Sequence, residues 1–172
     1  VVAALQLIQQ RAAECVADDQ QEVQPLVLDH RPDVVRVEAI GVVLNAYAED
    51  PMGGGHPLPE DILRQLPGEL AKRPHAFSVL AFVGGEPAGL VNCFEGFSTF
   101  ACRPLVNVHD VVVVNPFRGL GLSQKMLQKV EEIARQRGCC KITLEVLEGN
   151  AVAQSAYRKF GFDDSMFDPA AD

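Results

Sequence analysis

The chain has 172 residues, of which 48% are hydrophobic and 22% are charged, and its formal net charge is −8. This composition indicates one globular domain with a single core, and it excludes a disordered or fibrous protein. The negative charge argues against nucleic acid as a partner, because binding to a phosphate backbone depends on lysine and arginine.

The cysteines and the apolar segments give expectations about the compartment. The five cysteines form no C-x-x-C pair and two of them are adjacent, so we expect reduced thiols and a cytoplasmic protein. No apolar run approaches the ~20 residues that span a bilayer, and we expect no membrane association. The histidines lack the spacing of metal ligands, so no metal site is predicted.

Apolar residues recur at helical spacing near the start of the chain, at Leu5, Ile8, Ala12, Cys15 and Val16. They predict an amphipathic helix over residues 1–17 outside the core, with a partly ordered arm as the alternative. We therefore assign residues 1–22 to a helical arm or linker and residues 23–172 to the main domain.

The following residues predict a strand, two helices and a loop. Residues 26–28 form a short strand, and Asp33 can cap a helix that runs to about residue 48. Residues 50–57 contain three glycines and two prolines, which predicts a loop. A second helix runs from there to about residue 72.

The second half of the chain is richer in strands. Two β-rich runs, at 77–83 and 87–97, flank the turn residues Gly84-Gly85-Glu86 and predict a hairpin. A third strand at 105–114 precedes a helix at 122–136, a strand at 141–146 and a short helix. This order predicts a mixed α/β sheet in which the 122–136 helix crosses one face.

The segment from Val111 to Ser123 carries the clearest functional signal. Four valines at 111–114 predict a buried strand, and Arg118-Gly119-Leu120-Gly121-Leu122-Ser123 predicts a tight turn that opens the next helix. A dinucleotide fingerprint would need glycine or alanine at Gln124, and a P-loop would need Gly-Lys-Ser/Thr, so neither fits. Glycines allow close backbone approach, and free N–H groups of a first helical turn suit an anion. We expect a phosphate-bearing ligand here.

This turn resembles the Arg/Gln-x-x-Gly-x-Gly/Ala signature of the GNAT superfamily of acyl-CoA N-acyltransferases. Arg118, Gly121 and Ser123 occupy its positions, and serine departs from the pattern while remaining small. A second stretch, from Asn150 through Tyr157 to Gly161-Phe162, is similar to the Asn…Tyr…Gly-Phe signature of the same family. The resemblance covers roughly residues 23–162.

The resemblance implies a fold and a reaction. The fold is α/β (α+β), with a mixed, mostly antiparallel central sheet flanked by helices on both faces. The family usually has one more strand after Phe162, so the last strand is expected to be absent or to lie outside this chain. The reaction is direct transfer of an acetyl group from acetyl-CoA to a primary amine of a small-molecule or peptide acceptor. A homodimer is left open.

The resemblance also implies roles for particular residues. The residues implied to hold acetyl-CoA are Val111, Val113, Arg118, Gly119, Gly121, Leu122, Ser123, Asn150 and Ala153. Those implied to face the acceptor are Glu95, Ser98, Thr99 and Asn107. The 50–57 loop is expected to border the acceptor cleft, with an inert joint as the alternative.

Tyr157 and His109 are the candidate catalytic residues. The Tyr157 phenol would donate a proton to the departing thiolate, with a packing aromatic beside Phe160 and Phe162 as the alternative. Strand alternation places His109 on one face with Val111, and Asp110 on the other with Val112. Some relatives carry glutamate at the place of Asn107 or His109, and this chain has a carboxylate at neither.

The absent carboxylate leaves the base open. His109, with an ordinary pKa near 6.5, could accept the amine's proton directly or through water, or it could be a structural histidine. Asp110 is expected to be structural. The alternative function is a non-catalytic acyl-CoA-binding or regulatory module that keeps the cofactor turn without a working base.

Overall fold

A single sheet organises the chain. The computed structural model describes residues 2–8, 24–28 and 34–164, with side chains described from residue 38 to residue 163. The seven strands run in the spatial order β2-β3-β4-β5-β6-β1-β7. Their bounds are β1 Val2–Ile8, β2 Gln24–Leu28, β3 Ala76–Val83, β4 Glu86–Ser98, β5 Arg103–Val113, β6 Lys141–Leu147 and β7 Asp163–Asp164. Only the β5–β6 pair is parallel among these strands, which confirms the expected mixed, mostly antiparallel sheet.

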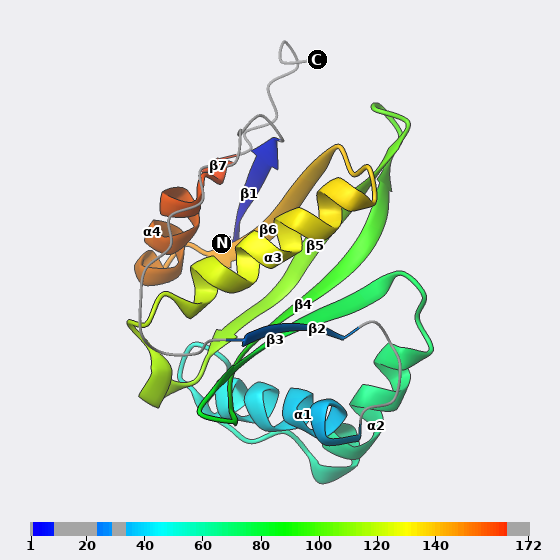
Figure 1. Cartoon of the computed structure of the whole chain (residues 1–172). Helices are drawn as coiled ribbons and strands as arrows, with labels where there is room; N and C mark the ends of the chain where they lie inside the picture. The colour runs from blue at the N-terminus through cyan, green and yellow to red at the C-terminus, as the bar shows by residue number, and fades with distance from the viewer. Residues whose placement is uncertain (1, 9–23, 29–33, 165–172) are drawn as a thin grey trace.

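Helices cover both faces of the sheet, as expected (Figure 1). The helices are α1 Val34–Glu49, α2 Glu60–Ala71, α3 Leu122–Gln136 and α4 Ala151–Phe160, and a short 3-10 turn, η1, spans Asn115–Phe117. The sheet residues alternate between two cores: Val79 and Val91 pack under α3, whereas Leu80 and Leu90 pack under α1. Burial on both faces explains why these strands are nearly continuous apolar runs.

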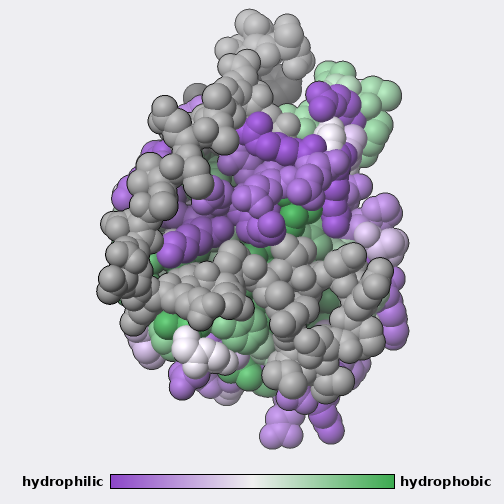
Figure 2. Space-filling view, in the orientation of Figure 1, coloured by the Kyte–Doolittle hydropathy of each residue, from purple (hydrophilic) through white to green (hydrophobic). Residues whose placement is uncertain are grey.

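The α3 helix shows the amphipathic pattern that the sequence predicts. Its inward face carries Leu122, Met126, Leu127, Val130, Ile133 and Ala134, all buried. Its outward face is hydrophilic, visible as the purple band across the middle of Figure 2. The predicted bounds of this helix, 122–136, are confirmed.

The expected N-terminal helix is wrong where the structure can test it. Val2–Ile8 form strand β1, which lies between β6 and β7 and pairs antiparallel with all of β6. A short apolar run fits a buried strand as well as a helix, and pairing with a partner strand decides between them. The rest of the predicted helix, residues 9–17, lies outside the described residues.

A β-bulge corrects the predicted faces of β5. Asn92 pairs with Asp110 but the next β4 residue, Cys93, pairs with Val108, so His109 is an extra residue in β5. Beyond it the alternation is reversed, because an inserted residue shifts every later side chain to the other face. Val108 and Val111 therefore both pack in the core under α3. Val111 does not share the face of His109 as strict alternation predicted.

Two glycines test the packing of this sheet. A Cβ on Gly89 of β4 would lie 3.0 Å from the Val112 carbonyl oxygen and 2.8 Å from Met126 Cε. We expect Gly89→Ala to lower the free energy of unfolding by ~1–3 kcal/mol through overpacking. Gly68→Ala in exposed α2, where nothing lies within 4 Å, should raise it by ~0.5–1 kcal/mol. Denaturant unfolding measures both, and equal effects would contradict the packing argument.

Candidate functional site

The turn before α3 is built to leave backbone N–H groups open. Gly121 is the N-cap in the left-handed region, at φ 71°, and no side chain caps the helix. Gly119 also has a positive φ of 83°, and a Cβ on either glycine would meet nothing within 4 Å. The first amides of a helix have no intrahelical acceptor and carry the positive end of its dipole. The turn therefore presents an open site for an anion, with Leu122 buried beneath it and Ser123 half-buried.

Arg118 joins this turn to two other segments. Its Nε donates to the Val113 carbonyl at 3.1 Å, and its Nη2 contacts Asp50 Oδ2 at 2.9 Å. Asp50 begins the Gly-rich loop and also accepts from the Met52 amide at 2.9 Å. The Met52 N–H and then Arg118 hold the pKa of Asp50 below its ordinary value. Arg118 therefore fixes the turn to the end of β5 and to the loop that the sequence predicts at 50–57.

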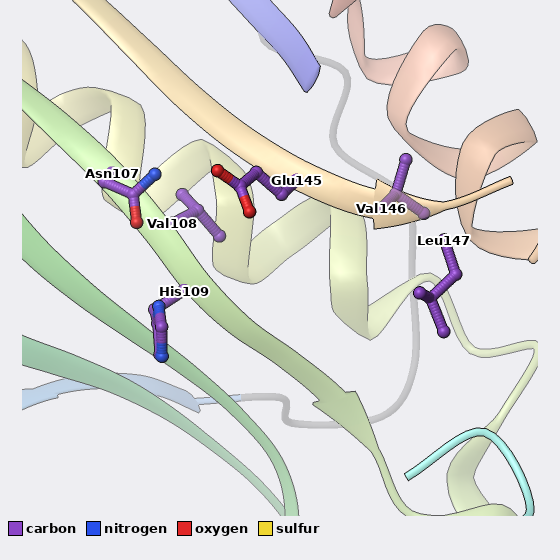
Figure 3. Close-up of a pocket in the computed structure, with 6 residues that line it drawn as sticks. All are labelled: Asn107, Val108, His109, Glu145, Val146 and Leu147. Carbon is purple, nitrogen blue, oxygen red and sulfur yellow. The ribbon is translucent and has the colours of Figure 1, made fainter. Parts of the chain in front are cut away.

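The parallel strands β5 and β6 separate partway along their length. They are paired only from Val106↔Ile142 to Val108↔Leu144, although β5 continues to Val113 and β6 to Leu147. A cleft of about 320 Å³ lies where they part. Three residues from each strand line it: Asn107, Val108 and His109 from β5, and Glu145, Val146 and Leu147 from β6 (Figure 3).

Tyr157 lies in α4, and α4 is held next to the turn. Asn150 Oδ1 caps α4 by accepting from the Ala153 amide at 3.1 Å. Gln124 Nε2 of α3 donates to the Ala156 carbonyl at 2.9 Å, which ties the first turn of α3 to α4. The Tyr157 ring is 8% exposed and packs edge-on against Phe162. Burial raises the pKa of Tyr157 to about 12, with a smaller contribution from Tyr47.

The residues predicted to face the acceptor fall into two groups. Asn107 lines the cleft and donates from Nδ2 to Thr143 Oγ1 of β6 at 3.2 Å. Glu95 instead pairs with Arg137 at 3.2 Å, just past the end of α3. Ser98 and Thr99 lie at the β4–β5 turn, where Ser98 Oγ accepts from the Ala101 amide. These three residues are at the opposite end of β5 from the Arg118 turn, and their role stays a prediction.

His109 is at the cleft but is not the buried histidine that the structural alternative described. It is exposed, and its ring stacks edge-on against Phe94 with centroids 5.4 Å apart. As the extra residue of the bulge it lines the cleft together with Asn107. Its role as a base is not tested by this geometry.

Two residues of this region were not among the predicted site residues. Tyr47 of α1 has a raised pKa, caused first by burial and then by the charges of Asp110 and Asp50. Tyr47 in turn contributes to the raised pKa of Tyr157. Side chains from α1, β5 and α4 therefore share one electrostatic environment. The alternation argument placed Asp110 correctly on the face of Val112, but it put Asn107 on the opposite face, so it did not bring these two side chains together.

The described parts of the chain show neither a metal-ligand cluster nor a membrane span. No group of three or more His, Cys, Asp or Glu side chains there could hold a metal ion. No helix in the same residues is long and apolar enough to cross a membrane. Cys93, Cys102, Cys139 and Cys140 are all free thiols.

Curated relatives of the chain are acetyltransferases. Thialysine N-epsilon-acetyltransferase of Caenorhabditis elegans is 33% identical over 86 residues, which cover 50% of this chain and 52% of that protein. Streptothricin acetyltransferase of Streptomyces lavendulae is 33% identical over 78 residues, covering 45% of this chain and 39% of that protein. The chain spans about half the length of the curated relatives it matches.

Solved structures share the fold at low sequence identity. The aminoglycoside N-acetyltransferase AAC(6')-Iy in complex with CoA superposes with a TM-score of 0.68 at 16% identity, covering 88% of this chain and 94% of that one. A probable acetyltransferase superposes with a TM-score of 0.69 at 20% identity, covering 84% and 91%. The family model described as acetyltransferase (GNAT) family matches residues 42–162, from within α1 to the end of the second signature. The chain therefore belongs to the acetyltransferase (GNAT) family.

Proposed function

We propose that the chain is an acetyl-CoA-dependent N-acetyltransferase that moves an acetyl group directly to a primary amine of a small molecule or peptide. The observation that carries this proposal is the meeting of three features: the open first turn of α3, the parting of β5 and β6, and the buried phenol of Tyr157. Its named relatives support it, since they include thialysine and streptothricin acetyltransferases.

The residues present fit the phosphate end of acetyl-CoA. The amides of Gly121, Leu122 and Ser123 would bind the pyrophosphate, and Gly119 and Gly121 leave room for it because neither carries a side chain. Arg118 adds a positive charge beside the turn, although Asp50 already engages one of its nitrogens. Its main contribution would be to hold the turn in place.

The parted strands fit the pantetheine arm. Beyond Val108, the β5 edge that faces β6 has no strand partner, so its backbone groups would pair with the amides of the arm. Val111 and Val113 belong to this stretch of β5. Ala153 would line the arm from α4, with Asn150 fixing the start of that helix.

Tyr157 would supply the proton that the leaving thiolate needs. The neutral amine attacks the thioester carbonyl, a C–N bond forms, the C–S bond breaks, and the sulfur takes the phenolic proton. A phenol of pKa about 12 is protonated and neutral at any ordinary pH, so the donor always carries the proton that it has to give. Donation to a thiolate of pKa ~8.5 is uphill, and the proton released by the nitrogen restores the phenol.

Two measurements test the proposal together. Calorimetry with acetyl-CoA reports binding, and release of free CoA thiol on adding a panel of primary amines reports transfer. An N-acetyltransferase should both bind acetyl-CoA and release free CoA thiol when an acceptor amine is added. Binding without thiol release, for every amine tested, would favour the non-catalytic acyl-CoA-binding module instead.

The first prediction concerns the anion site at Gly121. Gly121→Glu adds bulk and a negative charge at the turn and should abolish acetyl-CoA binding measured by calorimetry. Gly138→Glu is the matched control, since Gly138 has nearly the same φ, 70° against 71°, at the other end of α3. It imposes the same backbone strain away from the turn and should leave binding intact. Equal loss in both variants would contradict the assignment.

The second prediction concerns the proton donor. Tyr157→Phe should lower kcat by roughly 10²-fold, because general acid catalysis typically contributes at least that much. Acetyl-CoA affinity should change little, since removing one hydroxyl leaves the backbone amides of the anion turn unchanged. A variant with unchanged kcat would show that Tyr157 only packs against Phe162.

The third prediction uses the two tyrosines and the absence of tryptophan, which make the near-ultraviolet titration of this protein simple. Tyr47 and Tyr157 both have raised pKa values, so neither phenol should ionise near the ordinary value of 10.0, and Tyr157 should ionise near 12. Their contribution to stability is complete below the unfolded pKa and is lost as pH rises through the folded one. Tyr157→Phe should remove the later step, and an ordinary titration of both phenols would contradict the burial argument.

A further inference from the structure

We propose that Asp110, held in place by Asn92 and Ser78, binds the ammonium of the acceptor and takes its proton. This inference rests on the proposed function and assigns its missing base. In this proposal Asp110, and not His109, is the base. The sequence pattern had indicated only a structural role for Asp110.

The bulge in β5 determines where Asp110 points. Asp110 lies opposite Asn92 in the register and, two residues before Val112, on the same face as Val112. Val112 packs in the α1 core, so Asp110 also faces α1. Asn107 is on this face too, since its partner Thr143 alternates with Ile142 and Leu144 of the other core. The bulge thus adds a carboxylate to the face on which the cleft residue Asn107 lies.

A chain of hydrogen bonds orients the carboxylate. Ser78 Oγ donates to Asn92 Oδ1 at 2.7 Å, and Asn92 Nδ2 donates to Asp110 Oδ2 at 3.0 Å. Ser78 is 5% exposed and Asn92 is 4% exposed, and both sit among apolar neighbours such as Leu80 and Leu90. Ser78 fixes the direction of the Asn92 amide, which then presents its NH₂ group to the carboxylate. This chain fixes the orientation of the Asp110 carboxylate.

Asp110 has hydrogen-bond support but no counterion among the side chains that the structure describes. Other acidic residues of the described segment pair with cations: Asp50 with Arg118, Glu95 with Arg137, and Glu69 with Lys72. Among residues 38–163, no lysine or arginine forms an ion pair with Asp110. A half-buried carboxylate that only neutral donors support is a site that a ligand cation can complete.

The position of Asp110 suits a base better than those of its competitors. Asp110 contributes to the raised pKa of Tyr47, and Tyr47 contributes to that of the proposed acid Tyr157, so Tyr47 of α1 lies near both side chains. Glu145 and His109 line the cleft, but both are exposed. Exposed groups are held less firmly in the geometry that proton transfer requires.

The proton balance is closed. The acceptor's ammonium gives one proton to Asp110, which becomes neutral, and the free amine attacks the thioester. As the C–S bond breaks, the thiolate takes the Tyr157 proton, and the nitrogen's second proton restores the phenol. Asp110 then releases its proton to solvent, so one ammonium and acetyl-CoA yield one amide, free CoA and one proton.

Several titratable groups lie around Asp110 and the neighbouring cleft. They are Tyr47 on α1 with Asp50 at its end, Cys93 on β4, His109 beside it, Glu145 across the cleft and Tyr157 on α4. The Cys93 thiol and both phenols have raised pKa values and stay neutral at assay pH. Asp50 is already paired with Arg118, and Glu145 adds a further carboxyl group on the cleft that a cationic acceptor would meet.

The experiment compares three variants of the whole chain with a cationic primary amine and with a weakly basic amine that is already neutral. Asp110→Asn should lower kcat/KM for the cationic amine by roughly 10²-fold or more, with acetyl-CoA affinity unchanged. The loss should shrink for the neutral amine. Glu132→Gln on the outward face of α3 and Glu86→Gln at the β3–β4 turn are the controls, since both carboxylates are exposed and neither lines the cleft, and we expect each to retain activity within about threefold.

A fourth variant tests whether Asn92 positions the Asp110 carboxylate or only packs in the core. It also keeps the proposal testable if Asp110→Asn fails to fold. Asn92→Ser removes the donor to Asp110, so the acidic limb of kcat/KM should move to higher pH while the plateau is largely kept. A purely structural Asn92 would lower stability without moving that limb. Asp110→Asn activity within about twofold of wild type, or an unmoved limb in Asn92→Ser, overturns the assignment alone. Wild type that binds acetyl-CoA but turns over no amine overturns the proposed function, and this assignment with it.

Discussion

The site depends on the early end of hydrogen bonding between β5 and β6. Inside a sheet, backbone N–H and C=O groups are normally paired, and leaving them unpaired and buried is costly. Here the pairing stops at Val108↔Leu144, and both strands continue without each other. The unpaired edges remain wet or meet a ligand that carries its own amides. Every proposed role, from the anion turn to the proton donor, is placed relative to this opening.

The elements around the opening are fixed by few specific contacts. Arg118 joins the anion turn to β5 and the Gly-rich loop, and Gln124 joins α3 to α4. The bulge at His109 lies beside the point where β5 and β6 part. Because of the bulge, the apolar side chains on both sides of it stay under α3 while polar side chains reach the α1 face. A strand without the bulge could not serve both the core and the site with this sequence.

Local patterns predicted the parts that local chemistry determines. The α3 helix follows from apolar spacing and its glycine N-cap, and the 84–86 turn follows from its glycines. Two features were beyond this reasoning. Val2–Ile8 reads equally as helix or strand until β6 is available as a partner. The bulge depends on how β5 aligns with β4, and that register leaves no mark in the valine-rich run, so the common face of Asn107 and Asp110 was missed.

The place of β1 has a consequence for folding. Leu5 pairs with Leu144, so β6, which forms one wall of the cleft, is flanked on one side by β5 and on the other by a strand from the start of the chain. Contacts of such high sequence separation raise the contact order and slow folding, because loop-closure entropy is lost before the contact forms. The hairpin of β3 and β4 pairs strands that are adjacent in the sequence. The β6 wall of the cleft is completed only when β1 and β6, which are distant in the sequence, pair with each other. The part of the sheet that forms the cleft is therefore the part whose assembly is kinetically the most demanding.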